Sequence, residues 1–217
     1  DRMRAVINKG IEEHHLFHSM DLGLSAGIRN FRLYIMVGLP FEEEEDIDAI
    51  IDLAERLKDY MEARGSKGTL TLSVNPFIPK PFTPFQWEPM ADRKTVEKRL
   101  KRLEKTLRRR KHVVVNIESP KEAYIQGVLS RGDRRVGEAL MRAHELGGSK
   151  AFKRALKELR LDPAFYLYRK RPESELFPWE RLDMGFKKAY LYEELKRAEA
   201  LKPTIPCFEG CHRCGVC

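Results

Sequence analysis

The sequence predicts an α/β fold with parallel strands, mainly from the order and character of its first elements. An amphipathic helix over residues 11–26 precedes a strand at 31–37, and a helix over 42–63 precedes a strand at 69–75. Alternation of this kind is typical of parallel sheets in which helices connect the strands. The first strand is almost continuously apolar, as expected of a strand buried on both faces.

The second strand indicates what kind of sheet this is. Its apolar residues point to one face and its polar residues to the other, namely Leu70, Leu72 and Val74 against Thr69, Thr71, Ser73 and Asn75. Ordinary barrels fill their interiors with branched apolar side chains. If helices cover the apolar face, the polar face therefore lines a barrel interior that holds ligand or water. An exposed edge strand gives the same alternation and remains the alternative.

These patterns predict three segments. Residues 1–90 are expected to form the last strands and helices of a partial TIM-type (β/α)6 barrel. Residues 91–202 form a mostly helical extension with one further strand at 113–117, and residues 203–217 form a cysteine-rich tail. Helices of the extension are expected over 119–129, 133–147, 149–159 and 182–201.

Composition narrows the class of protein. Hydrophobic residues make up 42% of the 217 residues and charged residues 34%, which excludes low-complexity disorder. No apolar run is long enough to cross a membrane, and no signal-type segment opens the chain, so we expect a cytoplasmic protein without a membrane partner. The net charge is +8, and residues 93–111 hold eleven of the lysines and arginines. Such a segment either attracts RNA or another anionic substrate or forms a solvated helix face.

All four cysteines lie at the end of the chain, at Cys207, Cys211, Cys214 and Cys217. Scattered disulfides would look different, which favours a reducing compartment. Four thiolates this close can surround one ion or cluster, so we predict that they bind zinc or an iron–sulfur cluster. A tail of free thiols is the alternative.

Residues 76–89 hold five prolines interleaved with aromatic residues, which predicts a stiff, extended loop. It leaves the carboxyl end of a strand, where α/β folds place their sites. We expect it to be ordered there with Trp87 largely buried, and we assign Lys80 and Trp87 to substrate binding. Arg131 and Arg134, near a predicted helix start, are assigned to the same role through a phosphate or carboxylate. The alternatives for the loop are structural packing of its aromatic residues or a PxxP ligand for a partner domain. A purely structural role is the alternative for the arginines.

Three segments together resemble one enzyme family. The run LYIMVGLPFEEEEDI resembles the fifth strand and following helix of radical S-adenosylmethionine (SAM) enzymes, whose usual form is two hydrophobic residues followed by Gly-Phe-Pro-Gly-Glu-Thr. The run RMRAVINKGI resembles the segment before that strand, and LSVNPFIPKPFTPFQWEPM resembles the sixth strand and its exit loop. The run VLSRGDRRVGEAL is similar to a subgroup often fused to a cobalamin-binding-type domain. The resemblance covers residues 1–145.

The resemblance implies an oxidoreductase or group transferase with a [4Fe–4S] cluster, which cleaves SAM to methionine and a 5′-deoxyadenosyl radical. It implies that hydrophobic walls for the adenine come from Met36 to Gly38 and from Asn75 to Ile78, with Met36, Gly38, Asn75, Phe77 and Ile78 as cofactor-binding residues. The catalytic residues and the substrate are not implied.

The sequence shows one large departure from the family, because nothing upstream of residue 31 supplies the cluster motif C-x3-C-x2-C. We therefore expect the cluster to lie on an N-terminal part of the same enzyme, which would be the main partner of this chain, and the chain alone to be inactive. The alternative from another class of protein is a basic RNA-binding module with a C-terminal zinc knuckle and no chemistry of its own.

Overall fold

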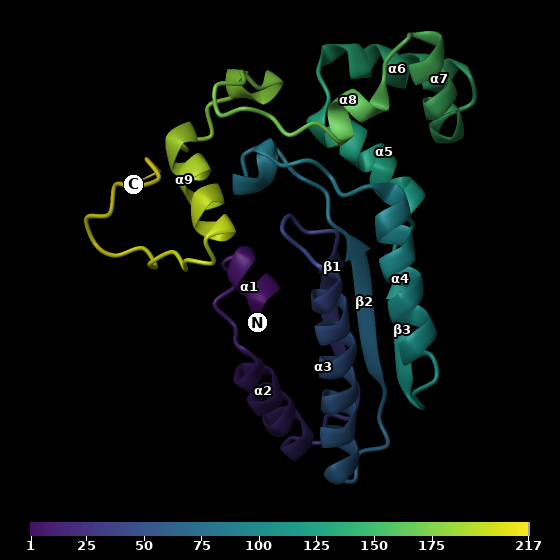
Figure 1. Ribbon diagram of the computed structural model, residues 1–217, viewed down its shortest axis with the longest axis vertical. Helices are drawn as coiled ribbons and strands as arrows, with labels where there is room; N and C mark the ends of the chain where they lie inside the picture. Colours follow the sequence, from purple (N-terminus) through teal and green to yellow (C-terminus); the bar gives the residue numbers. More distant parts are fainter. Residues whose placement is uncertain (217) are drawn as a thin grey trace. The chain divides into compact units, whose positions relative to one another are not determined.

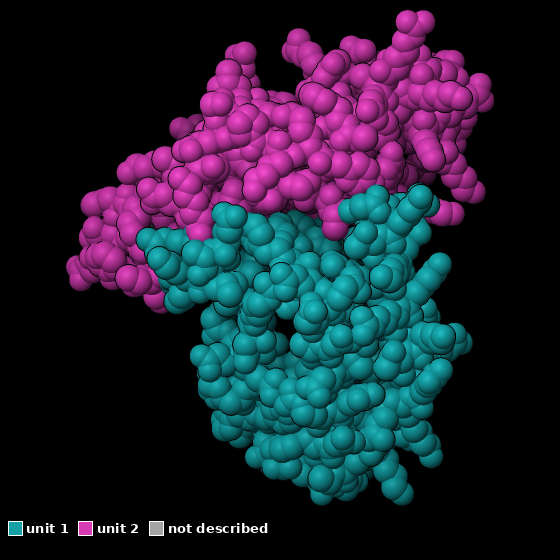
Figure 2. All heavy atoms as spheres, viewed as in Figure 1, with its two compact units in different colours: residues 1–77, 92–120, 197–204 teal, residues 78–91, 121–196, 205–217 magenta. Residues whose placement is uncertain are grey.

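The computed structural model describes residues 1–216 and divides into two compact units (Figures 1 and 2). The first unit comprises residues 1–77, 92–120 and 197–204. The second comprises residues 78–91 and 121–196 and continues from residue 205. The chain thus passes between the units repeatedly. The sequence had instead predicted three successive segments, at residues 1–90, 91–202 and 203–217.

The first unit is built on a parallel sheet. Among the described residues it has three strands, β1 (Phe31–Val37), β2 (Leu70–Pro76) and β3 (Val113–Ile117), in the order β1-β2-β3. Phe31 pairs with Leu70, and Leu70 pairs with Val113, so all three strands start level. The prediction that β1 and β2 are adjacent and parallel is confirmed.

The predicted barrel is wrong. The described residues form an open three-stranded sheet, and no barrel closes around it. The strand at 113–117, expected within a separate helical extension, pairs with β2 as the third strand. The alternation along β2 therefore arises neither in a barrel interior nor at a sheet edge. It arises in a central strand whose one face is buried and whose other face remains accessible.

Two helices connect the strands. α3 (Glu44–Ala63) joins β1 to β2, and α4 (Arg93–Leu107) precedes β3. Carboxylates fill the first turn of α3, where they complement the positive end of the helix dipole. Asp92 caps α4 by accepting hydrogen bonds from the amides of Lys94 and Thr95. The two helices contact each other.

One side of the sheet and the apolar stripes of α3 and α4 form the core of the first unit. The buried residues are Leu70, Leu72 and Val74 of β2, Ile47, Ala54, Leu57 and Met61 of α3, and Val96, Leu100, Leu103 and Leu107 of α4. The apolar residues of α4 thus recur at intervals of three or four and face the core.

The remaining helices are short. They are α1 (Arg2–Val6), α2 (Glu13–Ser25), α5 (Pro120–Arg131), α6 (Arg134–Glu145), α7 (Phe152–Glu158), α8 (Pro163–Leu167) and α9 (Lys188–Glu199), with 3-10 turns at Pro84–Trp87, Ser149–Ala151 and Pro178–Arg181. In the second unit, α5 to α8 share a core that includes Val128, Ala139, Phe152, Leu156 and Leu167. Among the described residues, no helix combines the length and the apolar character that crossing a membrane requires.

Candidate functional site

The accessible face of the sheet carries a group of polar and apolar side chains towards its carboxyl end. Tyr34 is 76% exposed and Met36 37% exposed, so the expectation that this strand is buried on both faces is wrong. Met36 pairs with Asn75, and Tyr34 is level with Ser73 and Asn116. Because residues level with each other on parallel strands point to the same side, these five side chains form one surface, which we call the sheet face.

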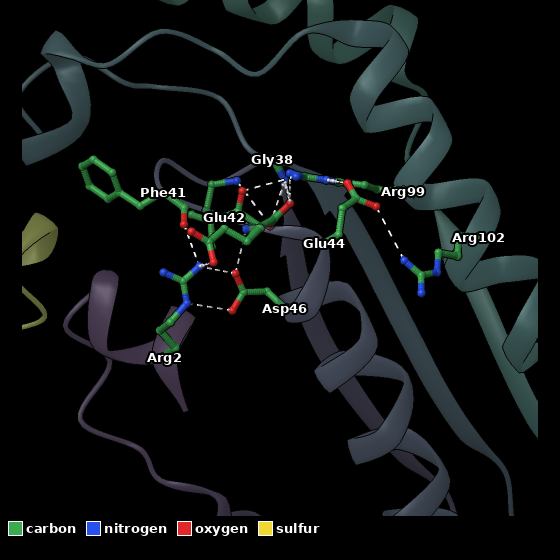
Figure 3. Close-up of polar contacts among 10 residues, drawn as sticks. Arg2, Gly38, Phe41, Glu42, Glu44, Asp46, Arg99 and Arg102 are labelled. Carbon is green, nitrogen blue, oxygen red and sulfur yellow. Dashed lines mark hydrogen bonds and ion pairs between the residues drawn. The ribbon is translucent and has the colours of Figure 1, made fainter.

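A tight turn leaves the same end of β1. Gly38 has a φ of 88° and Phe41 a φ of 65°, so two residues of this turn are left-handed. A left-handed conformation is unfavourable for a residue with a Cβ atom and persists only where its surroundings hold it. The contacts of Glu42 and Arg2 do so here, as Figure 3 shows.

Glu42 clamps the turn from inside. Its carboxylate accepts hydrogen bonds from the amide of Gly38 at 2.9 and 3.0 Å, and the amide of Leu39 lies 3.4 Å from Oε2. Arg99 of α4 donates from Nη1 to Glu42 Oε1 at 2.8 Å and from Nε to Glu44 at 2.8 Å. The Glu42 side chain is only 1% exposed. Burial raises the pKa of the Glu42 carboxyl, while the two amides and Arg99 stabilise its charged form.

Arg2 holds the turn from the other side. Its Nη2 donates to the carbonyl oxygen of Phe41 at 2.7 Å, and its Nε donates to Asp46 at 3.0 Å (Figure 3). Asp46 also accepts from the amide of Glu43 at 2.8 Å, which caps α3. The turn is therefore fixed to α1, α3 and α4 at once, and it presents a rigid backbone beside the sheet face.

Four of the five predicted cofactor-binding residues come together at this end of the sheet. Met36 and Asn75 lie side by side on the sheet face, Gly38 opens the turn, and the amide of Phe77 donates to the carbonyl of Val37 at 2.8 Å. Ile78 differs, because it begins the second unit and packs against the core of that unit.

The predicted substrate-binding residues lie in the second unit, and two of them have structural roles instead. Trp87 is fully buried, as expected for the proline-rich loop, and its ring contacts those of Phe177 and Tyr192. Arg131 is 2% exposed, and its guanidinium donates to the carbonyl oxygens of four residues, Gln86, Glu88, Tyr166 and Arg169. Neither side chain is accessible to a substrate in this structure.

Arg131 supports the loop rather than a ligand. No carboxylate hydrogen-bonds to its guanidinium among the described residues, and burial lowers its pKa to about 9. Lys80 and Arg134 are exposed, and Lys80 donates to Ser130 Oγ at 3.0 Å. These two remain predicted contacts for a substrate.

The cysteine tail is only partly arranged for a metal. Cys207 is exposed and its thiol hydrogen-bonds to that of Cys211, which is buried, while Cys214 is half-buried. Soft thiolates suit zinc and iron–sulfur clusters, but residues 1–216 bring no three cysteine, histidine or acidic side chains into a metal-binding group. Cys217 lies outside the described residues. The centre with four cysteines therefore stays a prediction.

Cys211 has the environment of a stable thiolate. The amide of Arg213 and its Nε, 3.1 Å from Sγ, both donate to the sulfur and lower the pKa of the Cys211 thiol to about 7. We expect the ultraviolet thiolate absorbance that Cys211→Ser removes to titrate with a midpoint near pH 7 in metal-free protein. In Arg213→Met the midpoint should rise only part of the way towards the ordinary value of about 8.5, because the amide of residue 213, which has the largest effect, is retained. An unchanged midpoint in Arg213→Met would show that Arg213 does not stabilise the thiolate.

Sequence reasoning missed two parts of this site. Tyr34, Ser73 and Asn116 were not assigned to a site, although Ser73 belongs to the polar face of β2. The sequence of β3 shows no such alternation, because Val114 is apolar and yet exposed. Arg99 was included in a basic run, and its spacing of three from Val96 and four from Leu103 was the available sign that it lies near the buried side of α4.

A protein of Methanocaldococcus jannaschii, described as uncharacterized, is 33% identical over 140 residues. The match covers 64% of this chain but 30% of the relative, so the chain spans less than a third of the relative's length. No family model matches the chain. No solved structure matches it either.

Proposed function

We propose that this chain is the C-terminal part of a radical SAM iron–sulfur enzyme, and that the sheet face with the turn after β1 forms part of the SAM site. The cluster and SAM, when bound in the intact enzyme, supply a 5′-deoxyadenosyl radical to an oxidoreductase or group-transfer reaction. By the family resemblance, the cluster that cleaves SAM would lie in an N-terminal part of the same enzyme.

The observation that carries this proposal is the conformation of the turn. In the family pattern the turn reads Gly-Phe-Pro-Gly-Glu, and the corresponding residues here are Gly38-Leu39-Pro40-Phe41-Glu42. Phe41 stands where the pattern has its second glycine, and it adopts the positive φ that glycine accepts without strain. The neighbouring Glu42 carboxylate binds the amides of Gly38 and Leu39. The backbone thus supports the resemblance at a position where the side chain departs from it.

The chemistry of the neighbouring side chains suits a purine. The Met36 thioether is exposed and polarizable, and thioethers make favourable contacts with aromatic rings. The Asn75 amide beside it offers a donor and an acceptor to the edge of such a ring. Because the turn and the strands hold both residues in place, little flexibility is lost when a ligand binds.

The test is SAM turnover by the full-length protein, purified anaerobically and reduced. We expect Met36→Lys to raise the KM for SAM about tenfold or more, because a charged side chain replaces an apolar contact with the adenine. Met141→Lys, at a methionine that is 71% exposed in α6, is the matched control and should leave KM unchanged. Absence of 5′-deoxyadenosine from the reduced, cluster-loaded protein would refute the proposal, and equal effects of the two substitutions would remove Met36 from the site.

A further inference from the structure

The outer face of α4 carries a regular row of cations that the fold does not use. Lys94, Lys98, Lys101, Lys105 and Arg108 follow one another at intervals of three or four residues, and all are exposed. Arg109 lies beside the end of this row. Since a helix has 3.6 residues per turn, the row presents one cation per turn on a single face over about 21 Å. We call these six residues the lysine row.

The arginines on the inner flanks of α4 behave differently. Arg99 binds Glu42 and Glu44, Arg102 binds Glu44 and Asp48, and Arg110, just beyond the helix, binds Asp59 and Glu62. The acidic residues of α3 and of the turn before it thus neutralise the inward cations. Within the described residues, no member of the lysine row forms an ion pair or donates a side-chain hydrogen bond.

α4 itself has few acidic residues that could offset the positive charge of the lysine row. Glu97 and Glu104 border the face, and Glu97 is already paired with Arg93. Folding therefore concentrates positive charge on one side of the helix, because it pairs the inward arginines and leaves the lysine row without ion pairs among the described residues. Lys98 nevertheless lies close enough to Glu44 to lower the pKa of that carboxyl. Six like charges at this spacing repel one another. An external anion with several charges would relieve this repulsion.

We propose that the lysine row binds the phosphate backbone of a nucleic acid strand, and that it does so independently of the SAM site. The occupant is a polymer because the cations repeat at a regular spacing over several turns. A membrane surface fits less well, because an interfacial helix inserts an exposed apolar face. The apolar face of α4 is buried in the core, and α4 has no large exposed hydrophobic residue. Backbone contacts of this kind give affinity without sequence specificity.

The experiment measures binding of labelled single-stranded RNA, and of DNA with the same sequence, by fluorescence anisotropy across a salt series. We expect the logarithm of the association constant to fall linearly with the logarithm of salt concentration, with a slope of about −0.7 per phosphate contact. Replacing Lys94, Lys98, Lys101 and Lys105 together with glutamine should weaken binding roughly a hundredfold at about 0.1 M salt and should flatten the slope.

The matched control replaces four exposed lysines of the second unit with glutamine, Lys121, Lys150, Lys153 and Lys157, which changes the net charge equally. It should bind nearly as tightly as the unmodified chain. Circular dichroism should show that both variants remain folded. Equal affinity for RNA and DNA would show that the protein recognises the phosphates alone. Tighter binding of RNA would show that RNA is the preferred ligand. Equal weakening in both variants, or binding only to anionic vesicles, would overturn the proposal.

Discussion

Replacing Glu42 with alanine is expected to lower the free energy of unfolding by about 3 kcal/mol, because it leaves a buried guanidinium partly unpaired. The carboxylate is 1% exposed and bonds to Arg99 and to the amides of Gly38 and Leu39. All three lose a partner in the variant, although Arg99 keeps Glu44. The measurement is urea unfolding followed by circular dichroism.

Glu44→Ala is the control for this substitution. Glu44 also binds Arg99, but its side chain is 40% exposed, so water replaces much of the lost interaction. We expect a much smaller loss of stability in Glu44→Ala than in Glu42→Ala. If the two variants lose equal stability, Glu42 is not the clamp that holds the turn.

Replacing Gly68 with alanine is expected to have a comparable or larger effect on folding. A Cβ atom at this position would lie 1.6 Å from the carbonyl oxygen of Arg29, which is backbone and therefore cannot rotate away. The segment before β2 would have to separate from the segment before β1, and Lys58, which donates to the Gly68 carbonyl at 2.9 Å, would be displaced. We expect a loss of more than about 3 kcal/mol, measured by the same urea unfolding.

Gly137→Ala in α6 is the control, and we expect it to stabilise the protein. A Cβ atom there meets nothing within 4 Å, and the residue lies in the interior of an exposed helical turn. Alanine should stabilise the protein by about 0.5–1 kcal/mol, because it restricts the unfolded chain and favours the helix. A loss of stability in Gly137→Ala similar to that in Gly68→Ala would mean that the contact with Arg29 is not the cause.

Local patterns in the sequence predicted the positions of the strands better than they predicted which strands pair. The strands at 31–37 and 113–117 match β1 and β3, because apolar and β-branched runs bounded by turn residues are a local signal. The sequence does not say that residues 113–117 lie beside β2, since pairing depends on how α4 packs across the sheet. A barrel was therefore expected where an open sheet exists.

The roles of the buried charged residues were likewise not predictable from local sequence patterns. Arg99 and Arg131 both belong to segments that looked like solvated or ligand-binding surface, yet one clamps the turn and the other binds four backbone carbonyls. Their roles depend on groups more than thirty residues away in the chain. Trp87 was predicted correctly as buried, because stiff proline backbone around an aromatic residue favours a fixed, packed loop.

The most direct measurement is ultraviolet cross-linking of radiolabelled SAM to the full-length protein, followed by peptide mapping. If the sheet face and the turn bind the cofactor, the label should appear in peptides containing residues 31–42 and 70–77, and excess unlabelled SAM should suppress it. Met36→Lys should reduce the labelling, and Met141→Lys should not. Labelling confined to other peptides, or unchanged in Met36→Lys, would contradict the assignment of this face to SAM.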